Sequence, residues 1–188
     1  YSLVARMARF LRDRGVVEGD RVAAFSANRI EVVVTMLAAT SLGAVFSSCS
    51  PDFGFKGVMD RFGQIRPKVL LSADGYRYGG KSFDSLDRVR RVREAIDSIE
   101  VVVLVPVLAG SPDTEGLGEF VLWPQALDND ATEVDFAQLP FDHPVYILYS
   151  SGTTGVPKCI VHGAGGTTLQ HAKELMLQTN LDRDSVLF

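Results

Sequence analysis

Residues 21–48 read RVAAFSANRIEVVVTMLAATSLGAVFSS, and this stretch decides the fold. Residues 21–25 predict a short strand, and residues 44–48 predict a second one. Between them, Asn28 can cap a helix that runs to about Leu42. This helix is apolar nearly all round, so we expect it to be buried on two sides. A strand, a helix and another strand in succession are typical of parallel sheets.

The same alternation continues along the chain. Further strands are predicted at residues 69–71, 101–105 and 145–149, and further helices at residues 56–65, 84–98 and 165–178. The β-branched run at residues 101–105 suits a central parallel strand. Residues 74–81 and residues 109–135 are expected to be loops, because both are interrupted by glycines. We therefore predict an α/β fold with a mostly parallel sheet flanked by helices.

The composition excludes several classes of protein. With 188 residues, 46% of them hydrophobic and 22% charged, the chain resembles a globular domain and not a disordered or fibrous protein. A net charge of −4 argues against a general nucleic-acid-binding protein. The longest apolar stretch, residues 101–109, contains Pro106 and is too short to span a membrane. Cys49 and Cys159 form neither a disulfide framework nor a metal-ligand pattern, which favours a reducing compartment and hence the cytoplasm.

The segment with the clearest chemical character is YSSGTTGVPK, residues 149–158, which follows a predicted strand. Its glycines allow backbone N–H groups to turn toward a ligand, and consecutive amides in such a turn form a concave anion site. Its Ser and Thr hydroxyl groups add hydrogen-bond donors, and Lys158 adds a positive charge. This combination predicts a polyphosphate ligand.

The spacing in this segment differs from that of the P-loop NTPases. Their motif has four residues between its glycines and a Lys directly after the second, whereas two residues separate Gly152 from Gly155 and two more precede Lys158. Cys159 stands where a magnesium-binding hydroxyl would follow. A switch-type NTPase is therefore disfavoured, and a plain surface turn is the alternative to a binding loop.

Residues 149–158 resemble the phosphate-binding signature of the adenylate-forming enzymes, which include acyl-CoA synthetases, luciferases and peptide-synthetase adenylation domains. The family pattern ends in Pro-Lys-Gly, whereas this chain has Cys159 after the lysine. Four other motifs are similar to those of acetoacetyl-CoA synthetases: SSCSPDFG (47–54), DRFGQI (60–65), ADGYRY (73–78) and IVHGAGG (160–166). The resemblance extends over nearly the whole chain.

The resemblance implies an enzyme with two half-reactions. A carboxylate, here acetoacetate, attacks the α-phosphate of ATP and gives an acyl-adenylate and pyrophosphate, and the thiol of CoA then displaces AMP. Mg²⁺ would bridge phosphate oxygens. Its protein ligand in the family is a Glu in a later motif, so no metal ligand is assigned within the chain.

The matching motifs also imply which residues carry this chemistry. The ATP phosphates are assigned to Ser150, Ser151, Gly152, Thr153, Thr154, Gly155 and Lys158. Lys158 and Thr154 are the two assigned to catalysis, because donors aimed at the leaving pyrophosphate lower the barrier as its charge develops. Arg77 and Lys81 are assigned to a CoA phosphate, with solvated surface charge as the alternative.

We expect one partial AMP-binding domain over residues 1–188, truncated at both ends. The chain begins with Tyr1 instead of Met, and the family's adenine, ribose, magnesium and C-terminal lysine sites would lie downstream. These residues alone are therefore expected to lack adenylation activity. The alternatives are an acetyl- or other short-chain acyl-CoA synthetase, a non-catalytic nucleotide-binding module, and a structural or protein-binding domain.

Three further features have less specific interpretations. Phe53 could border a CoA entrance, but core packing is favoured for a lone aromatic residue. His162 could shape an acyl pocket, but a hydrogen-bonded structural role is favoured. The arginine-rich helix at residues 84–98 is interpreted as a solvated face with salt bridges, because acidic residues alternate with the arginines.

Overall fold

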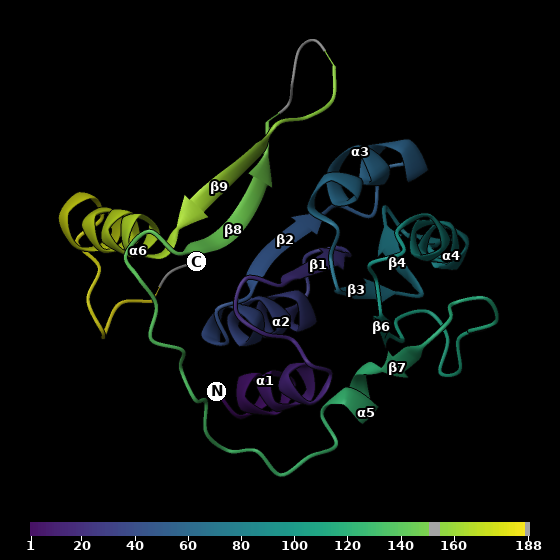
Figure 1. Cartoon of the computed structure of the whole chain (residues 1–188), viewed down its shortest axis with the longest axis horizontal. Helices are drawn as coiled ribbons and strands as arrows, with labels where there is room; N and C mark the ends of the chain where they lie inside the picture. Colours follow the sequence, from purple (N-terminus) through teal and green to yellow (C-terminus); the bar gives the residue numbers. More distant parts are fainter. Residues whose placement is uncertain (151–154, 187–188) are drawn as a thin grey trace.

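A computed structural model describes residues 1–150 and 155–186. Among these residues, seven strands form one sheet in the order β7-β6-β3-β1-β2-β8-β9 (Figure 1). They are β1 (Arg21–Phe25), β2 (Val45–Cys49), β3 (Val69–Ala73), β6 (Val101–Val105), β7 (Phe120–Leu122), β8 (Pro144–Tyr149) and β9 (Cys159–Gly163). Strands β8 and β9 pair in antiparallel fashion, and the other neighbours in this sheet are parallel. The predicted α/β fold with a mostly parallel sheet is confirmed.

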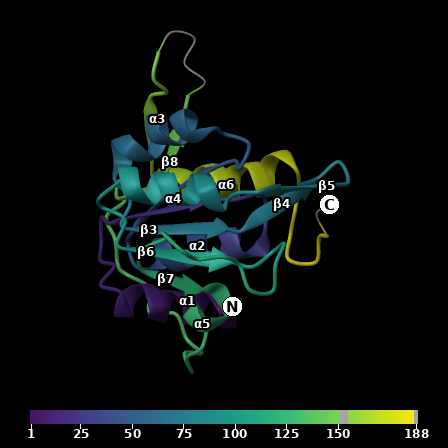
Figure 2. The same cartoon turned by 90° about the vertical axis from the view of Figure 1, so that its right-hand side faces the viewer.

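Helices cover both faces of the sheet, as Figure 2 shows. Helices α1 (Ser2–Asp13), α2 (Ile30–Ser41) and α5 (Trp123–Ala126) pack on one face, and α3 (Phe55–Ile65) and α4 (Leu86–Ala95) pack on the other. Strand residues alternate between two hydrophobic cores: Val103 of β6 joins the core under α1 and α2, whereas Val102 and Leu104 join the core under α3 and α4. A strand buried on both faces is therefore apolar along its whole length. No helix in the described part of the chain is long and apolar enough to cross a membrane.

Helix α2 is buried on one side, which corrects the expectation of burial on two sides. Val34 and Ala38 are buried in the core shared with α1 and the sheet. On its outer side, Ile30 is 63% exposed, and Val33 and Leu37 are exposed as well. The all-round apolar pattern therefore predicted the helix but not its surroundings.

The expected loop at residues 74–81 is part of an antiparallel hairpin. Strand β4 (Gly75–Tyr78) pairs with β5 (Lys81–Asp84), separately from the main sheet. Gly79 and Gly80 connect them with φ angles of 56° and 76°. Two successive residues with positive φ make the tight turn that hairpins favour, and glycine adopts this conformation at no steric cost.

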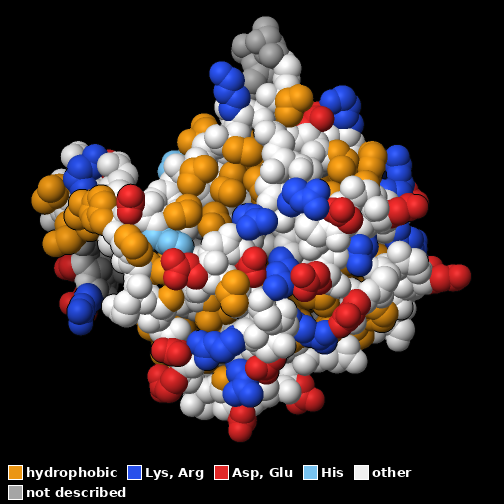
Figure 3. All heavy atoms as spheres, viewed as in Figure 1, with side chains coloured by type: hydrophobic (Ala, Val, Ile, Leu, Met, Phe, Trp, Pro, Cys, Tyr) orange, Lys and Arg blue, Asp and Glu red, His pale blue; other side chains and the backbone are white. Residues whose placement is uncertain are grey.

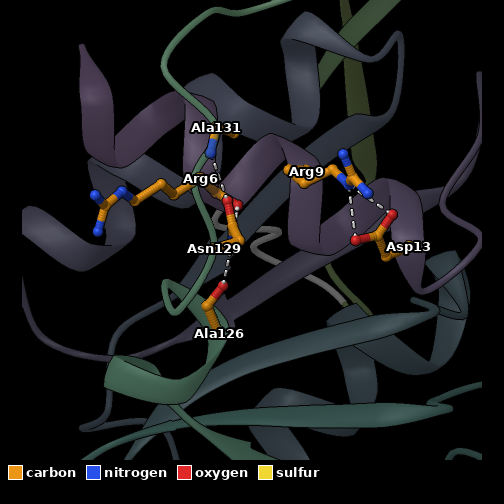
Figure 4. A network of polar contacts seen from close by, with 6 residues as sticks. All are labelled: Arg6, Arg9, Asp13, Ala126, Asn129 and Ala131. Atoms are coloured by element: carbon orange, nitrogen blue, oxygen red, sulfur yellow. Dashed lines mark hydrogen bonds and ion pairs between the residues drawn. The ribbon is translucent and has the colours of Figure 1, made fainter.

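Residues 109–135 are also not wholly a loop, because they contain β7 and α5. Strand β7 pairs with β6, so β6 is an inner strand and β1 is the central one. The Asn129 side chain ties this segment to α1, because its Nδ2 donates to the Arg6 carbonyl oxygen at 3.1 Å (Figure 4). Its Nδ2 also lies 3.3 Å from the Ala126 carbonyl oxygen, and its Oδ1 accepts from the Ala131 N–H at 3.2 Å.

The C-terminal part of the described chain exposes apolar side chains. The β8–β9 hairpin leads into α6 (Ala164–Lys173) and a π-helical turn, η1 (Glu174–Gln178). Neither α6 nor η1 contains a buried residue, and hydrophobic side chains gather over this part at the left of Figure 3. Leu177 is 74% exposed. This region therefore contributes little to either core.

Candidate functional site

The predicted phosphate loop begins and ends at a closed neck. Tyr149, the last residue of β8, pairs with Cys159, the first residue of β9. Next to them, the Ser150 N–H donates to the Lys158 carbonyl oxygen at 3.1 Å, and the Lys158 N–H donates to Ser150 Oγ at 3.1 Å. The loop is therefore held at its base by the strand ladder and by one of its own hydroxyl groups.

The described residues of the loop face solvent. Gly155, Val156 and Lys158 are exposed, so this part of the segment is not folded into the hydrophobic interior. Gly155 has a φ of +117°, a backbone conformation that residues with a Cβ rarely adopt. Four of the predicted phosphate ligands lie outside the described residues: Ser151, Gly152, Thr153 and Thr154. Their assignment, and the catalytic assignment of Lys158 and Thr154, stay predictions.

A second candidate site, which we call the carboxyl-edge cleft, lies where the parallel strands end. It consists of two adjoining hollows of about 440 and 430 Å³ that share Ala27, Asn28, Tyr76 and Arg77. Strand β1 leads to α2 on one face of the sheet, whereas its neighbours β2 and β3 lead to α3 and α4 on the other face. Neighbouring strands whose connections leave in opposite directions open a crevice, and α/β proteins commonly bind ligands there.

The hairpin register separates the two cations predicted to bind CoA. Arg77 lies opposite Ser82, and Lys81 lies opposite Tyr78. Because opposite residues share a face and successive residues alternate, Arg77 and Lys81 lie on opposite faces of the hairpin. Arg77 lines the carboxyl-edge cleft and Lys81 is not among its lining residues. Within the described part of the chain, neither side chain takes part in a hydrogen bond or ion pair, so the Arg77 charge is available to an anion.

A buried carboxylate fixes the base of this hairpin. Asp74 is 2% exposed, and its side chain accepts hydrogen bonds from the backbone N–H groups of residues 107–109 at 2.7–3.1 Å. The next residue, Gly75, lies so close to the Phe83 carbonyl oxygen that a Cβ would not fit. The position of Arg77 therefore depends on buried contacts at the start of β4 and not only on the turn.

One rim of the cleft is closed by a contact between Tyr76 and Asp52. The Tyr76 hydroxyl donates to Asp52 Oδ1 at 2.9 Å, and its ring stacks on Phe83 with the centroids 5.1 Å apart. The hydrogen bond to Asp52, followed by burial, raises the pKa of Tyr76 above its ordinary value, so this hydroxyl stays a neutral donor. Arg88 donates to the Pro51 carbonyl oxygen at 2.8 Å and holds the same segment.

Sequence reasoning missed Asn28, Asp52 and Tyr76 as residues that line the cleft. Asn28 is predicted to cap α2, but Arg29 occupies that position and Asn28 lines the cleft. Each of the three comes within three residues of the carboxyl end of a parallel strand. That position was the signal that could have located them.

Two interpretations of single residues need correction. Phe53 is not in the core: it is 36% exposed, and the Arg61 guanidinium carbon lies 4.1 Å from its ring centroid. For His162, no side-chain hydrogen bond is found within residues 1–150 and 155–186, so the favoured structural role has no support. His143 is the histidine with such a role, because its Nε2 lies 2.8 Å from the Gly43 carbonyl oxygen.

The arginines of α4 contact other segments and not the acidic residues of their own helix. Arg90 forms an ion pair with Asp113 at 2.8 Å, and the Arg91 guanidinium lies 4.4 Å from the Phe55 ring centroid. The expected salt bridge is therefore found for Arg90, but its partner lies in the loop after β6 and not on α4 itself.

The two thiols are unsuited to nucleophilic catalysis. Both cysteines are free. Burial raises the pKa of the Cys49 thiol to about 12, and burial also raises the pKa of Cys159. Little thiolate would therefore form at neutral pH. In the part of the chain that the structure describes, no group of three or more His, Cys, Asp or Glu residues could hold a metal ion.

Comparison with known proteins decides the family. A model of the family described as AMP-binding enzyme matches residues 1–187. The chain belongs to the AMP-binding enzyme family. It is 48% identical to the acetoacetyl-coenzyme A synthetase of Rhizobium meliloti (strain 1021) over 194 aligned residues, which cover 100% of this chain and 29% of the relative.

Two other comparisons place this AMP-binding chain among longer proteins. A solved structure of acetoacetyl-CoA synthetase from Streptomyces lividans is similar with a TM-score of 0.90 and 42% identity, covering 96% of this chain and 27% of that chain. The malonamoyl-CoA synthetase vrtB of Penicillium aethiopicum is 39% identical, covering 95% of this chain and 26% of the relative. The chain thus spans less than a third of the length of these proteins.

Proposed function

We propose that this chain is part of the AMP-binding domain of an AMP-forming acetoacetate–CoA ligase. The observation that carries the proposal is the 48% identity, over the whole chain, to a relative named acetoacetyl-coenzyme A synthetase. The TM-score of 0.90 with a solved structure of that name supports it. The adenine, ribose and C-terminal lysine sites are proposed to lie elsewhere in the full-length protein.

The proposed reaction has two steps. A carboxylate oxygen of acetoacetate attacks the α-phosphorus of ATP, and the bond from that phosphorus to the pyrophosphate oxygen breaks. The products are acetoacetyl-adenylate and pyrophosphate. The sulfur of CoA then attacks the acyl carbon, the thiol proton is lost, and AMP leaves to give acetoacetyl-CoA.

The phosphate loop is proposed to stabilise the leaving pyrophosphate. Negative charge builds on the pyrophosphate oxygens as the α–β bond breaks, so preorganised donors lower the barrier. Lys158 supplies a positive charge at the loop's exposed neck, and the hydroxyl and amide groups of residues 150–155 supply donors. The loop contains no carboxylate, so it suits phosphate oxygens and not Mg²⁺ itself. Mg²⁺, when bound, would neutralise part of the phosphate charge.

Arg77 is proposed to meet a phosphate of CoA in the carboxyl-edge cleft. It is exposed, it lines both hollows, and a guanidinium pairs well with phosphate. Lys81 is the weaker of the two CoA candidates, because it lies on the other face of the hairpin.

The test of this function is pyrophosphate exchange into ATP by the full-length protein with acetoacetate present. In Lys158→Ala, we expect the exchange rate to fall about 100-fold or more, because one group that stabilises the transition-state charge is lost. Thioester formation from supplied acetoacetyl-adenylate should change much less. Lys173→Ala is the matched control, since Lys173 is also exposed and its ion pair with Glu174 lies at the junction of α6 and η1. An equal loss in both half-reactions would assign Lys158 a structural role.

A specific alternative exists for the acyl group that the enzyme activates. The malonamoyl-CoA synthetase relative is 39% identical over nearly the same residues, so similarity in this region is shared by enzymes named for different acyl groups. Exchange assays with acetoacetate, acetate and malonamate separate these functions. Stabilisation by Mg-ATP without exchange for any acid would instead identify a non-catalytic nucleotide-binding module. The free thiols of Cys49 and Cys159 suit the proposed cytoplasmic location.

A further inference from the structure

One face of α3 contacts both ends of the phosphate loop, at Tyr149 of β8 and at Pro157 just before β9. Gly57, Arg61 and Gln64 are spaced four and three residues apart, so they lie along one side of the helix. Lys56 lies on the same helix, but it is exposed and forms an ion pair with Asp60 at 2.6 Å. Arg61 and Gln64 have contacts outside the helix that Lys56 lacks among the described residues.

Arg61 contacts the residue that leads into the loop. Its guanidinium carbon lies 5.6 Å from the Tyr149 ring centroid and 4.1 Å from the Phe53 ring centroid. Its NH1 group donates to the Gly57 carbonyl oxygen at 2.8 Å, which holds the side chain against the helix. The side chain is therefore fixed between Tyr149 and the segment that contains Asp52, a residue of the carboxyl-edge cleft.

Gln64 contacts the loop segment that leads into β9. Its Nε2 donates to the Pro157 carbonyl oxygen at 2.9 Å, and Pro157 directly precedes Lys158. Tyr149 is held from its other side as well, because its hydroxyl lies 3.0 Å from Ser47 Oγ of β2. Burial raises the pKa of Tyr149, so this hydroxyl remains protonated. Both ends of the loop are thus fastened to neighbouring elements.

We propose that Arg61 and Gln64 are positioning residues for the phosphate loop, acting through Tyr149 and Pro157. The proposal rests on the proposed function of that loop. A segment rich in Gly, Ser and Thr loses much conformational freedom when it is ordered around a ligand. Contacts that fix its two ends before ATP binds reduce that loss, and donors that are already oriented stabilise charge without reorganisation.

The first experiment measures kinetics of the full-length protein with Gln64→Glu. A carboxylate has the same shape but cannot donate to the Pro157 carbonyl oxygen, and the exposed position of Gln64 allows the fold to persist. We expect KM for ATP to rise about tenfold, the usual effect of losing one hydrogen bond, while KM for acetoacetate changes little. Lys56→Gln is the matched control, because it also lowers the net charge by one on the exposed part of α3. Equal KM values in the two variants would overturn the proposal.

Arg61→Lys supplies a second variant that retains the charge. A flexible ammonium lacks the planar group that stacks on Phe53 and Tyr149, so KM for ATP should again rise about tenfold. A general loss of stability would instead lower kcat for both half-reactions together and reduce Tm. That result would assign Arg61 to folding and contradict its positioning role.

The second experiment needs no activity and so separates this proposal from the proposed function. Hydrogen exchange is measured in peptides that cover residues 149–160 in the wild type, Gln64→Glu and Lys56→Gln. We expect faster exchange only in Gln64→Glu, because the neck amides of Ser150 and Lys158 open more often. Identical exchange in all three proteins overturns the positioning role. Absence of acetoacetate-dependent pyrophosphate exchange in the wild type overturns the proposed function and leaves this readout valid.

Discussion

Two regions of the molecule differ in how completely the described residues cover them. One consists of strands β1, β2, β3 and β6, and the other consists of the β8–β9 hairpin and α6. The first region, which we call the sheet body, is buried on both faces by helices, and each strand contributes to two cores. In the second region, Leu148, Ile160 and Val161 are exposed on the hairpin, and α6 has no buried residue. The same kinds of apolar residue therefore have different surroundings in the two regions.

One region therefore stabilises the fold, and the other carries the proposed binding loop. The sheet body is stabilised by residues that lie close together within the described chain. The hairpin carries the proposed phosphate loop, whose donors must reach a ligand and so cannot be buried. Exposed apolar surface of this extent is typical of regions that contact other protein surfaces.

The largest contrast should come from removing an apolar side chain in each region. Phe62 is fully buried in the core under α3, so Phe62→Ala should lower the free energy of unfolding by about 3–5 kcal/mol. Leu177→Ala should change it by less than about 0.5 kcal/mol, because that side chain is mostly exposed in η1. Urea denaturation of the 188-residue chain measures both values. Similar losses in the two variants would mean that the regions are equally well packed.

A smaller contrast is expected for two aspartates. Asp74→Asn should lower the free energy of unfolding by about 1–3 kcal/mol, because an amide cannot accept from all three N–H groups that the carboxylate now satisfies. Asp182 accepts from Ser185 Oγ at 2.7 Å in the exposed C-terminal segment, so Asp182→Asn should have little effect. Thermal unfolding of both variants tests this order. The reverse order would show that the β4–β5 hairpin is not fixed by Asp74.

A further contrast, which appears only at alkaline pH, concerns the two thiols. The pKa of Cys49 is raised to about 12 in the folded state, against an ordinary value of 9.0. Between these values the unfolded chain has lost the thiol proton and the folded chain retains it. The free energy of unfolding should therefore fall by about 1.4 kcal/mol per pH unit as pH rises above 9, and the contribution is fully present below 9.

The comparison of wild type with Cys49→Ala isolates this contribution, since other groups titrate equally in both. The difference between the two proteins should narrow as pH rises from 9 toward 12. Cys159→Ala should show a smaller change with pH, because that thiol is only half-buried. A constant difference between wild type and Cys49→Ala over this range would contradict the burial of Cys49.

The sequence predicted the parts of the fold that follow from local pattern. Apolar runs such as residues 101–105 predicted strands, and helical spacing predicted α2 to α4, because period and burial are directly related. Short elements were missed where the local signal is weak: β7 has three residues and α5 has four. The predicted burial of the outer face of α2 was wrong, because a sequence pattern does not say what lies on each side of a helix.

The two candidate sites also differ in whether the sequence could predict them. The proposed phosphate loop could be predicted from sequence because the residues assigned to it are consecutive, at 149–158. The carboxyl-edge cleft was missed because Asn28, Asp52 and Tyr76 come from three connections that only the strand order brings together. The contacts of Gln64 with Pro157 likewise depend on packing between α3 and the hairpin, which no local pattern encodes.

A crystal structure of the full-length protein with Mg²⁺ and a non-hydrolysable ATP analogue would show whether residues 150–158 hold the phosphates of ATP. We expect β- and γ-phosphate oxygens within hydrogen-bond distance, about 2.7–3.2 Å, of backbone N–H and hydroxyl groups of this loop, with Lys158 Nζ beside them. Phosphates bound elsewhere, with the loop turned away from them, would show that this segment does not bind ATP.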